Sequence, residues 1–295
     1  NEGVNSTIEF LSQKIETTYC LYCSDDDFIA LNGIAKSLVF LKENPEYNAV
    51  HGKGAMISLD SDGCFGNMVS LFSYPQAIVD GESAAERLKN YLIPPYAMLY
   101  SLHRTDSWKK MFRGFSSYEW AGSQQITIDE LLSSGISAIL GKIKEIDDLY
   151  LIRQSHSNAS GGNRLNPYEL VIHKHWSIAI KDMSKRFIDE IMSKDQIEYD
   201  EAKDLVNKIY LSYLEYIFIS HQQRIDQKDV SLVLIKNLIK KYMPLYLKIF
   251  ITNTLFFRNK KKSLLSMRVL EDQSSIYYND MMLIKNVCLE KLKDE

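Results

Sequence analysis

The sequence has few cysteines, and their spacing limits what they can do. Among 295 residues there are four, Cys20, Cys23, Cys64 and Cys288. Cys20 and Cys23 form a C-x-x-C pair, but no second pair follows, so a zinc site has little support. Side chains three residues apart on a strand also point to opposite faces. We therefore interpret the cysteines as buried, reduced thiols of a cytoplasmic protein.

Two other absences exclude whole classes of protein. The net charge is -3, without the basic excess that contacts with phosphate groups require, so we expect no nucleic-acid partner. No apolar stretch approaches the roughly 20 residues that span a bilayer, and no signal-peptide pattern is present. Apolar residues nevertheless make up 45% of the chain, enough to bury a core in one large domain or two modest ones.

Helical and extended patterns alternate in the first half of the chain, which is the order of an α/β sheet. Asn44-Pro45 ends one predicted helix, and apolar-polar alternation around Ser61-Asp62-Gly63 predicts a strand excursion, interpreted as a hairpin. The expected elements are helices near 6–15, 32–42, 80–92 and 127–143, a strand at 18–23, the excursion at 49–72, a strand then a short helix within 96–108, and a strand at 148–156.

The second half of the chain has a different texture. The clearest linker is "SNASGGN", residues 157–163. After Pro167 the chain lacks glycine and repeats apolar residues at intervals of three and four, which indicates helices. We therefore divide the chain into an α/β region at residues 1–160 and a helical extension at 165–295.

Three consecutive acids, Asp25, Asp26 and Asp27, follow a short apolar run in "YCLYCSDDDF". In α/β proteins, ligands bind at the carboxyl ends of the strands. Two carboxylates at i and i+2 of an extended chain leave the same face, so Asp25 and Asp27 are predicted to converge on Mg²⁺ or Mn²⁺. Asp26 would face the other way in a supporting role. The alternatives are an acidic cap for the next helix or a solvated turn.

The same segment resembles the DxD-bearing strand of the GT-A nucleotide-sugar glycosyltransferases, particularly bacterial family 2-like enzymes. The segments "GIAKSLVFLKENPEYNAVHGK", "YSLHRTDSW" and "IDELLSSGISAILGKIKEIDDLYLIRQSH" are also similar to that family, so the resemblance covers about residues 5–160. It implies a GT-A-like (Rossmann-like) mixed sheet flanked by helices, followed here by an all-helical C-terminal region. Such a fold normally begins with a nucleotide-binding βαβ region, and we expect that half to be missing from this chain.

The resemblance implies transfer of a sugar from a nucleotide diphosphate sugar to a glycan or lipid-linked acceptor. A metal held by Asp25 and Asp27 would stabilise the departing diphosphate, and Asp25 and Asp26 would also contact the donor. His156, just past a predicted strand end, is expected to complete the metal shell. Arg153 is expected to pair with the diphosphate. The alternatives are an exposed loop histidine and an ordinary salt-bridged arginine.

A general base would be needed to activate the acceptor hydroxyl. The resemblance places it near Asp129 and Glu130, and Glu130 is the first candidate with Asp129 as the second. The alternative is structural, because Thr127-x-x-Glu130 is itself a capping-box pattern and acids favour helix N-termini. The sequence does not distinguish an inverting from a retaining reaction.

The helical extension has its own expected partners. Its tyrosine-rich helices are expected to pack against the catalytic region or against another subunit. The basic run Arg258–Lys262 after an apolar segment would allow peripheral contact with the anionic inner face of the membrane. Two other functions stay open: another metal-dependent phosphoryl or nucleotidyl transfer enzyme using the same aspartates, and a non-catalytic helical interaction protein.

Overall fold

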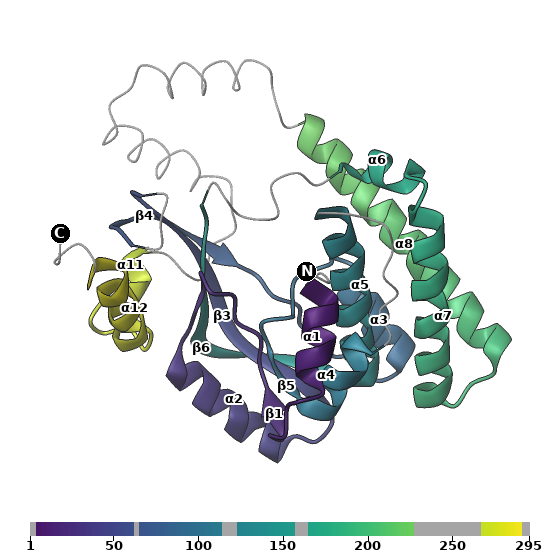
Figure 1. The fold of residues 1–295 in the computed structure, drawn as a ribbon, viewed down its shortest axis with the longest axis horizontal. Helices are drawn as coiled ribbons and strands as arrows, with labels where there is room; N and C mark the ends of the chain where they lie inside the picture. The colour runs from purple at the N-terminus through teal and green to yellow at the C-terminus, as the bar shows by residue number, and fades with distance from the viewer. Residues whose placement is uncertain (1–3, 62–64, 114–122, 157–164, 227–266, 291–295) are drawn as a thin grey trace.

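The protein is described by a computed structural model covering residues 4–61, 65–113, 123–156, 165–226 and 267–290. Within these residues a mixed sheet lies between two groups of helices (Figure 1). The helices are α1 (Val4–Ser12), α2 (Leu31–Glu43), α3 (Ala84–Leu92), α4 (Thr105–Phe112), α5 (Ser123–Leu140), α6 (Pro167–Ile172), α7 (Trp176–Asp195), α8 (Tyr199–Asp226), α11 (Met267–Leu270) and α12 (Tyr278–Glu290). The strands are β1 (Tyr19–Cys20), β2 (Phe28–Ile29), β3 (Tyr47–Leu59), β4 (Met68–Tyr74), β5 (Leu102–Arg104) and β6 (Lys142–Gln154).

The described strands form one sheet in the order β1-β5-β3-β6-β2, with β4 also paired to β3. The long central strands β3 and β6 are parallel, and the other pairs are antiparallel. The predicted hairpin is confirmed, because β3 and β4 pair from Gly54 opposite Tyr74 to Leu59 opposite Met68. A mixed sheet flanked by helices, followed by further helices, is the fold class that the sequence predicts.

Several predicted boundaries differ from the structure. The strand expected at 18–23 is only Tyr19–Cys20. The helix expected at 80–92 begins at Ala84, because Ser83 caps it in a reciprocal pair of hydrogen bonds with Glu86. The helix expected at 127–143 runs from Ser123 to Leu140. The predicted linker at 157–163 lies outside the described residues.

The thiols follow the sequence prediction only in part. Cys20 is half-buried, Cys23 is exposed, and both are free thiols. Cys288 is buried. The expectation of burial is therefore wrong for Cys23, because the chain leaves β1 before reaching it. Cys64 lies outside the described residues.

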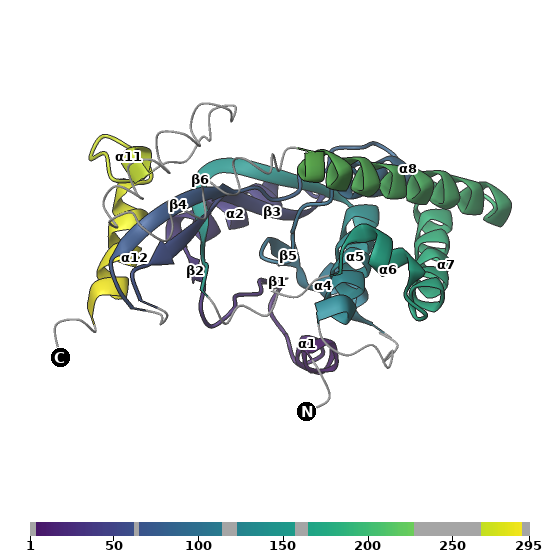
Figure 2. The ribbon, with the colours of Figure 1, turned by 90° about the horizontal axis from the view of Figure 1, so that it is seen from above.

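The main core lies among helices on one side of the sheet, as Figure 2 shows from above. Helices α7 and α8, from the second half of the chain, share this core with α3, α4 and α5. A glycine lets two of these helices approach closely: a Cβ at Gly135 of α5 would lie 2.4 Å from the ring of Phe187 on α7. The predicted helical extension thus packs directly on the α/β region.

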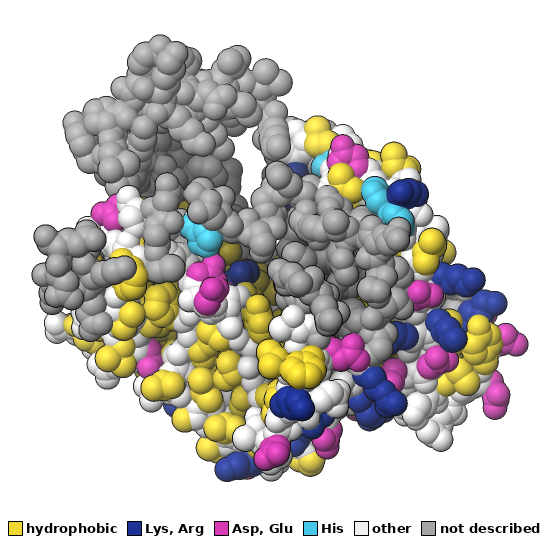
Figure 3. Space-filling model, in the orientation of Figure 1, with side chains coloured by type: hydrophobic (Ala, Val, Ile, Leu, Met, Phe, Trp, Pro, Cys, Tyr) yellow, Lys and Arg dark blue, Asp and Glu magenta, His cyan; other side chains and the backbone are white. Residues whose placement is uncertain are grey.

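A second core lies on the other side, where α12 packs against the sheet. Met281 and Ile284 of α12 join Ile57 of β3 and Ile152 of β6 in this core. Apolar side chains also remain on the outer surface over α2 and α12 (Figure 3), where Val39 is 54% and Leu283 63% exposed.

The membrane question can be answered only for the described helices. None of them is both long enough and apolar enough to cross a bilayer. The basic run Arg258–Lys262 lies outside the described residues, so peripheral contact stays a prediction.

Candidate functional site

The three acids form a tight turn between β1 and β2, not an extended strand end. The amide of Asp27 donates to the carbonyl of Ser24 at 3.3 Å, which closes the turn, and β2 begins only at Phe28. Alternation of side chains between two faces holds only for an extended chain. The predicted side-by-side geometry of Asp25 and Asp27 is therefore wrong. We call residues 24–27 the acid turn.

Asp27 points into the protein, and both of its carboxylate oxygens accept hydrogen bonds from β6. Oδ1 accepts from the backbone N–H of Gln154 at 3.0 Å, and Oδ2 accepts from Nε of Arg153 at 3.1 Å. The Asp27 side chain is 0% exposed. A buried carboxylate needs such partners because its desolvation is costly. Asp27 therefore joins the acid turn to the end of β6.

Asp26 points to the outer edge of the sheet, where it meets His156. Its Oδ2 lies 2.8 Å from Nε2 of His156, and the two side chains are 27% and 18% exposed. His156 follows the last residue of β6, Gln154, by two positions. The structure thus brings His156 to the same edge as the acids, as its position in the sequence predicts. Its role as a metal ligand stays a prediction. Asp25 is exposed.

Arg153 is enclosed by aromatic rings. Its guanidinium lies 5.1 Å from the ring centre of Tyr74 and 4.8 Å from that of Tyr100, within cation–π range. Its Nη1 donates to the hydroxyl of Tyr74 at 3.2 Å. Arg153 therefore has the salt-bridged role that the sequence left open as an alternative, and contact with a diphosphate stays a prediction.

Tyr100 also holds the beginning of the acid turn. Its hydroxyl lies 3.0 Å from Oγ of Ser24. Burial raises the pKa of the Tyr100 phenol, so the group stays neutral and can donate a hydrogen bond at physiological pH. The first and last residues of the acid turn, Ser24 and Asp27, are therefore both bonded to the surrounding protein.

Glu130 lies inside α5 and not at its start. Because α5 begins at Ser123, the capping box of Thr127 with Glu130, which the sequence left open as the alternative, does not form. Burial raises the pKa of the Tyr74 phenol, and the negative charge of Glu130 contributes to the same shift. The charge of Glu130 therefore acts on Tyr74, one of the two tyrosines whose rings lie near Arg153. Asp129 lies on α5, but its side chain is outside the described part of the chain.

A divalent ion needs several oxygen or nitrogen donors that converge on one point. In the described part of the chain no group of three or more His, Cys, Asp or Glu side chains is placed to hold a metal ion. Asp26 and His156 supply one carboxylate and one imidazole in direct contact. The carboxylate suits Mn²⁺ or Mg²⁺, whose other positions water and phosphate oxygens commonly fill, whereas imidazole is more typical of Zn²⁺ and other transition metals. The pair therefore fits part of a metal shell.

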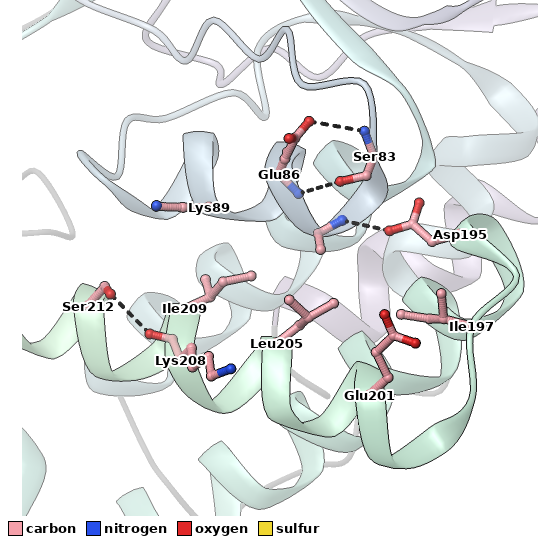
Figure 4. A pocket seen from close by; sticks show the side chains of 11 residues that line it. Ser83, Glu86, Lys89, Asp195, Ile197, Glu201, Leu205, Lys208, Ile209 and Ser212 are labelled. Atoms are coloured by element: carbon pink, nitrogen blue, oxygen red, sulfur yellow. Dashed lines mark hydrogen bonds between the residues drawn. The ribbon is translucent and has the colours of Figure 1, made fainter.

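A separate groove of about 600 Å³ lies between α3 and α8 (Figure 4). None of the predicted site residues lines it. Asp195, at one end of the groove, accepts from the backbone N–H groups of Ala84 at 2.6 Å and Ala85 at 3.1 Å, which caps α3. We assign this groove no part in the candidate site.

Comparison with known proteins gives a distant likeness in fold to solved structures. No protein-family model matches the chain, and no curated protein matches its sequence. Among solved structures, the crystal structure of S. aureus TarS, a glycosyltransferase, is similar with a TM-score of 0.40 and 13% identity. The match covers 71% of this chain and 30% of the TarS chain, so this chain spans less than a third of that protein. At this level of similarity the site has to be judged by its own geometry.

Proposed function

We propose that the protein is a metal-dependent glycosyltransferase that moves a sugar from a nucleotide diphosphate sugar to a glycan or lipid-linked acceptor. The observation that supports this most is the contact of Asp26 Oδ2 with His156 Nε2 at 2.8 Å on the sheet edge. A carboxylate and an imidazole at the end of a sheet would supply two ligands to Mn²⁺ once the ion replaced the proton that they share in this contact, and the carboxylate alone would suit Mg²⁺.

Asp26 and His156 would hold the ion, in place of the Asp25 and Asp27 pair that the sequence suggested. When bound, the metal would supply a Lewis acid that offsets the negative charge developing on the leaving diphosphate. Arg153, whose charge is paired with Asp27 of the acid turn, stays the proposed contact for the diphosphate. Asp25, which is exposed, would be available to the donor.

Glu130 is the proposed general base. Its carboxylate would accept the proton of the acceptor hydroxyl as that oxygen attacks the sugar. The charge of Glu130 contributes to the raised pKa of Tyr74, whose ring contacts Arg153, and this supports the assignment. Asp129, the neighbouring residue, remains the second candidate for this role.

The test is a panel of nucleotide sugars incubated with the protein and Mn²⁺, with release of the nucleoside diphosphate measured. A glycosyltransferase releases nucleoside diphosphate from its donor, slowly to water if no acceptor is present. Release of a nucleoside monophosphate instead would indicate phosphoryl or nucleotidyl transfer. The proposal fails if no donor is cleaved and Mn²⁺ does not bind, as measured by electron paramagnetic resonance of the free ion.

A further inference from the structure

We propose that Asp27 is a positioning residue, which sets the separation of Asp26 and His156 without binding the metal itself. Arg153 and the backbone of Gln154 are its partners. The inference rests on the proposed function for its metal, while its structural part stands on the contacts alone.

The first argument is that both carboxylate oxygens of Asp27 are bonded to the protein and the side chain is buried. One oxygen accepts from the backbone of Gln154 and the other from the side chain of Arg153. With a side chain that is 0% exposed, Asp27 has no open side facing solvent. A metal ligand would need an oxygen turned toward the ion and its waters.

The second argument is the register of the sheet. Strand β2 pairs antiparallel with β6, with Phe28 opposite Ile152 and Ile29 opposite Leu151. The next pair in this register would be Asp27 opposite Arg153. There the backbone pairing stops, and the Asp27 side chain makes the cross-strand bonds instead. Asp27 thus extends the connection between the two strands by one step beyond the ladder.

The third argument is how close this connection lies to the candidate ligands. Asp26 is the immediate neighbour of Asp27, and His156 follows Gln154 by two residues. With so few rotatable bonds between tether and ligand, a fixed Asp27 restricts where the two ligand side chains can lie. Outer contacts of this kind commonly orient metal ligands, and their loss typically lowers metal affinity by roughly 10–100-fold.

Two tyrosines also restrict the position of Arg153, the partner of Asp27. The rings of Tyr74 and Tyr100 both lie within cation–π range of the guanidinium of Arg153. Tyr100 also contacts Ser24 at the opposite end of the acid turn. Removing the arginine would leave a buried, unpaired carboxylate, which is more disruptive than removing both members of the pair. If Asp27 only positions the ligands, the single Arg153 variant should therefore be at least as damaging as the double variant. If Asp27 binds the metal, removing Arg153 alone should have little effect.

The experiment measures Mn²⁺ affinity by electron paramagnetic resonance for the full chain and for Asp27→Asn, Arg153→Met and the double variant. We expect each single change to weaken binding by about 10–100-fold, and the double variant to be no weaker than the worse single. Asp26→Asn, which removes a proposed ligand, should abolish binding. If Arg153→Met binds Mn²⁺ as well as the unchanged chain while Asp27→Asn does not bind, Asp27 is a ligand and the inference is wrong.

A matched control comes from another ion pair on the same strand. Asp148 of β6 pairs with Lys36 of α2, whose side chain is 61% exposed. Asp148→Asn and Lys36→Met should leave Mn²⁺ affinity within twofold of the unchanged chain. An equal loss in these variants would show that any ion pair on β6 has the same effect, which would overturn the specific role of Asp27.

A second measurement does not depend on metal. Amide hydrogen exchange at Gln154 should accelerate at least tenfold in Asp27→Asn, while exchange at Ile152, which pairs with Phe28 of β2, stays unchanged. Tyr74→Phe, a milder change, should accelerate Gln154 less. If the unchanged chain binds no Mn²⁺, the proposed function fails. The exchange rate at Gln154 still tests whether Asp27 connects the acid turn to β6. Unchanged Gln154 exchange in Asp27→Asn would overturn the tether itself.

Discussion

Nε2 of His156 lies 2.8 Å from Oδ2 of Asp26, although 130 positions separate the two residues in the chain. The sheet brings them together, because β2 and β6 are antiparallel neighbours and the two residues lie just beyond the paired ends. This is the pair that we propose as metal ligands.

Metal removal should stop the proposed reaction in a way that depends on this pair. We expect treatment with EDTA to abolish donor cleavage, and added Mn²⁺ to restore it in the unchanged chain. In His156→Ala, restoration should fail or need far more Mn²⁺ than the roughly 10–100-fold increase typical of losing an outer contact, because one proposed ligand is gone. The measurement is donor cleavage against free Mn²⁺ concentration. Identical Mn²⁺ requirements in both proteins would exclude His156 as a ligand.

Glu130→Gln should slow the reaction without weakening donor binding. A carboxamide cannot accept the proton of the acceptor hydroxyl, and general-base catalysis typically contributes 10²–10⁴-fold. We therefore expect kcat to fall by about that factor while KM for the donor changes little. Asp129→Asn serves as the comparison, since Asp129 is the second candidate. A large loss in Asp129→Asn with normal kcat in Glu130→Gln would reverse the assignment.

His103 should make the stability of the fold depend on pH. It is 0% exposed, and burial lowers its pKa from 6.5 to about 4. Between those values the unfolded chain binds a proton that the folded chain does not bind. The contribution of His103 to stability is therefore complete above about pH 6.5 and is lost as the pH falls toward 4, by about 3 kcal/mol at most.

The check for His103 is the free energy of unfolding in urea from pH 7 to pH 4. His103→Leu removes the titrating group, so its stability should fall less steeply with acid than that of the unchanged chain. Other groups, including the buried His51, also contribute to the slope, so only the difference between the two proteins is informative. Parallel curves would mean that His103 is protonated in the folded protein as readily as in the unfolded one.

The sequence predicted the parts of this structure that local patterns determine. The β3–β4 hairpin follows from apolar-polar alternation, and the location of His156 follows from the end of an apolar strand. The acid turn did not follow, because the two-face alternation applied to Asp25 and Asp27 assumes an extended chain. No sequence pattern predicted that Tyr74 and Tyr100 would contact Arg153, because these residues are brought together only by the three-dimensional arrangement of the chain.

Gly33→Ala tests how closely α2 must approach the strand that ends at the candidate site. In an exposed helix interior this change stabilises a protein by roughly 0.5–1 kcal/mol. Here a Cβ would lie 2.4 Å from the backbone carbonyl oxygen of Leu149 on β6, too close for any side-chain adjustment to relieve. We therefore expect the opposite sign, a loss of about 1–3 kcal/mol in the free energy of unfolding, as in other overpacked sites.

Urea unfolding of Gly33→Ala should be compared with that of Val39→Ala on the same helix. The side chain of Val39 is 54% exposed, so its truncation should change stability by no more than about 0.5 kcal/mol. If Gly33→Ala also lowers Mn²⁺ affinity while Val39→Ala does not, the displacement of α2 reaches the end of β6, where Arg153 and Gln154 hold Asp27. A stabilised Gly33→Ala variant would show that α2 does not rest on β6 as closely as the structure has it.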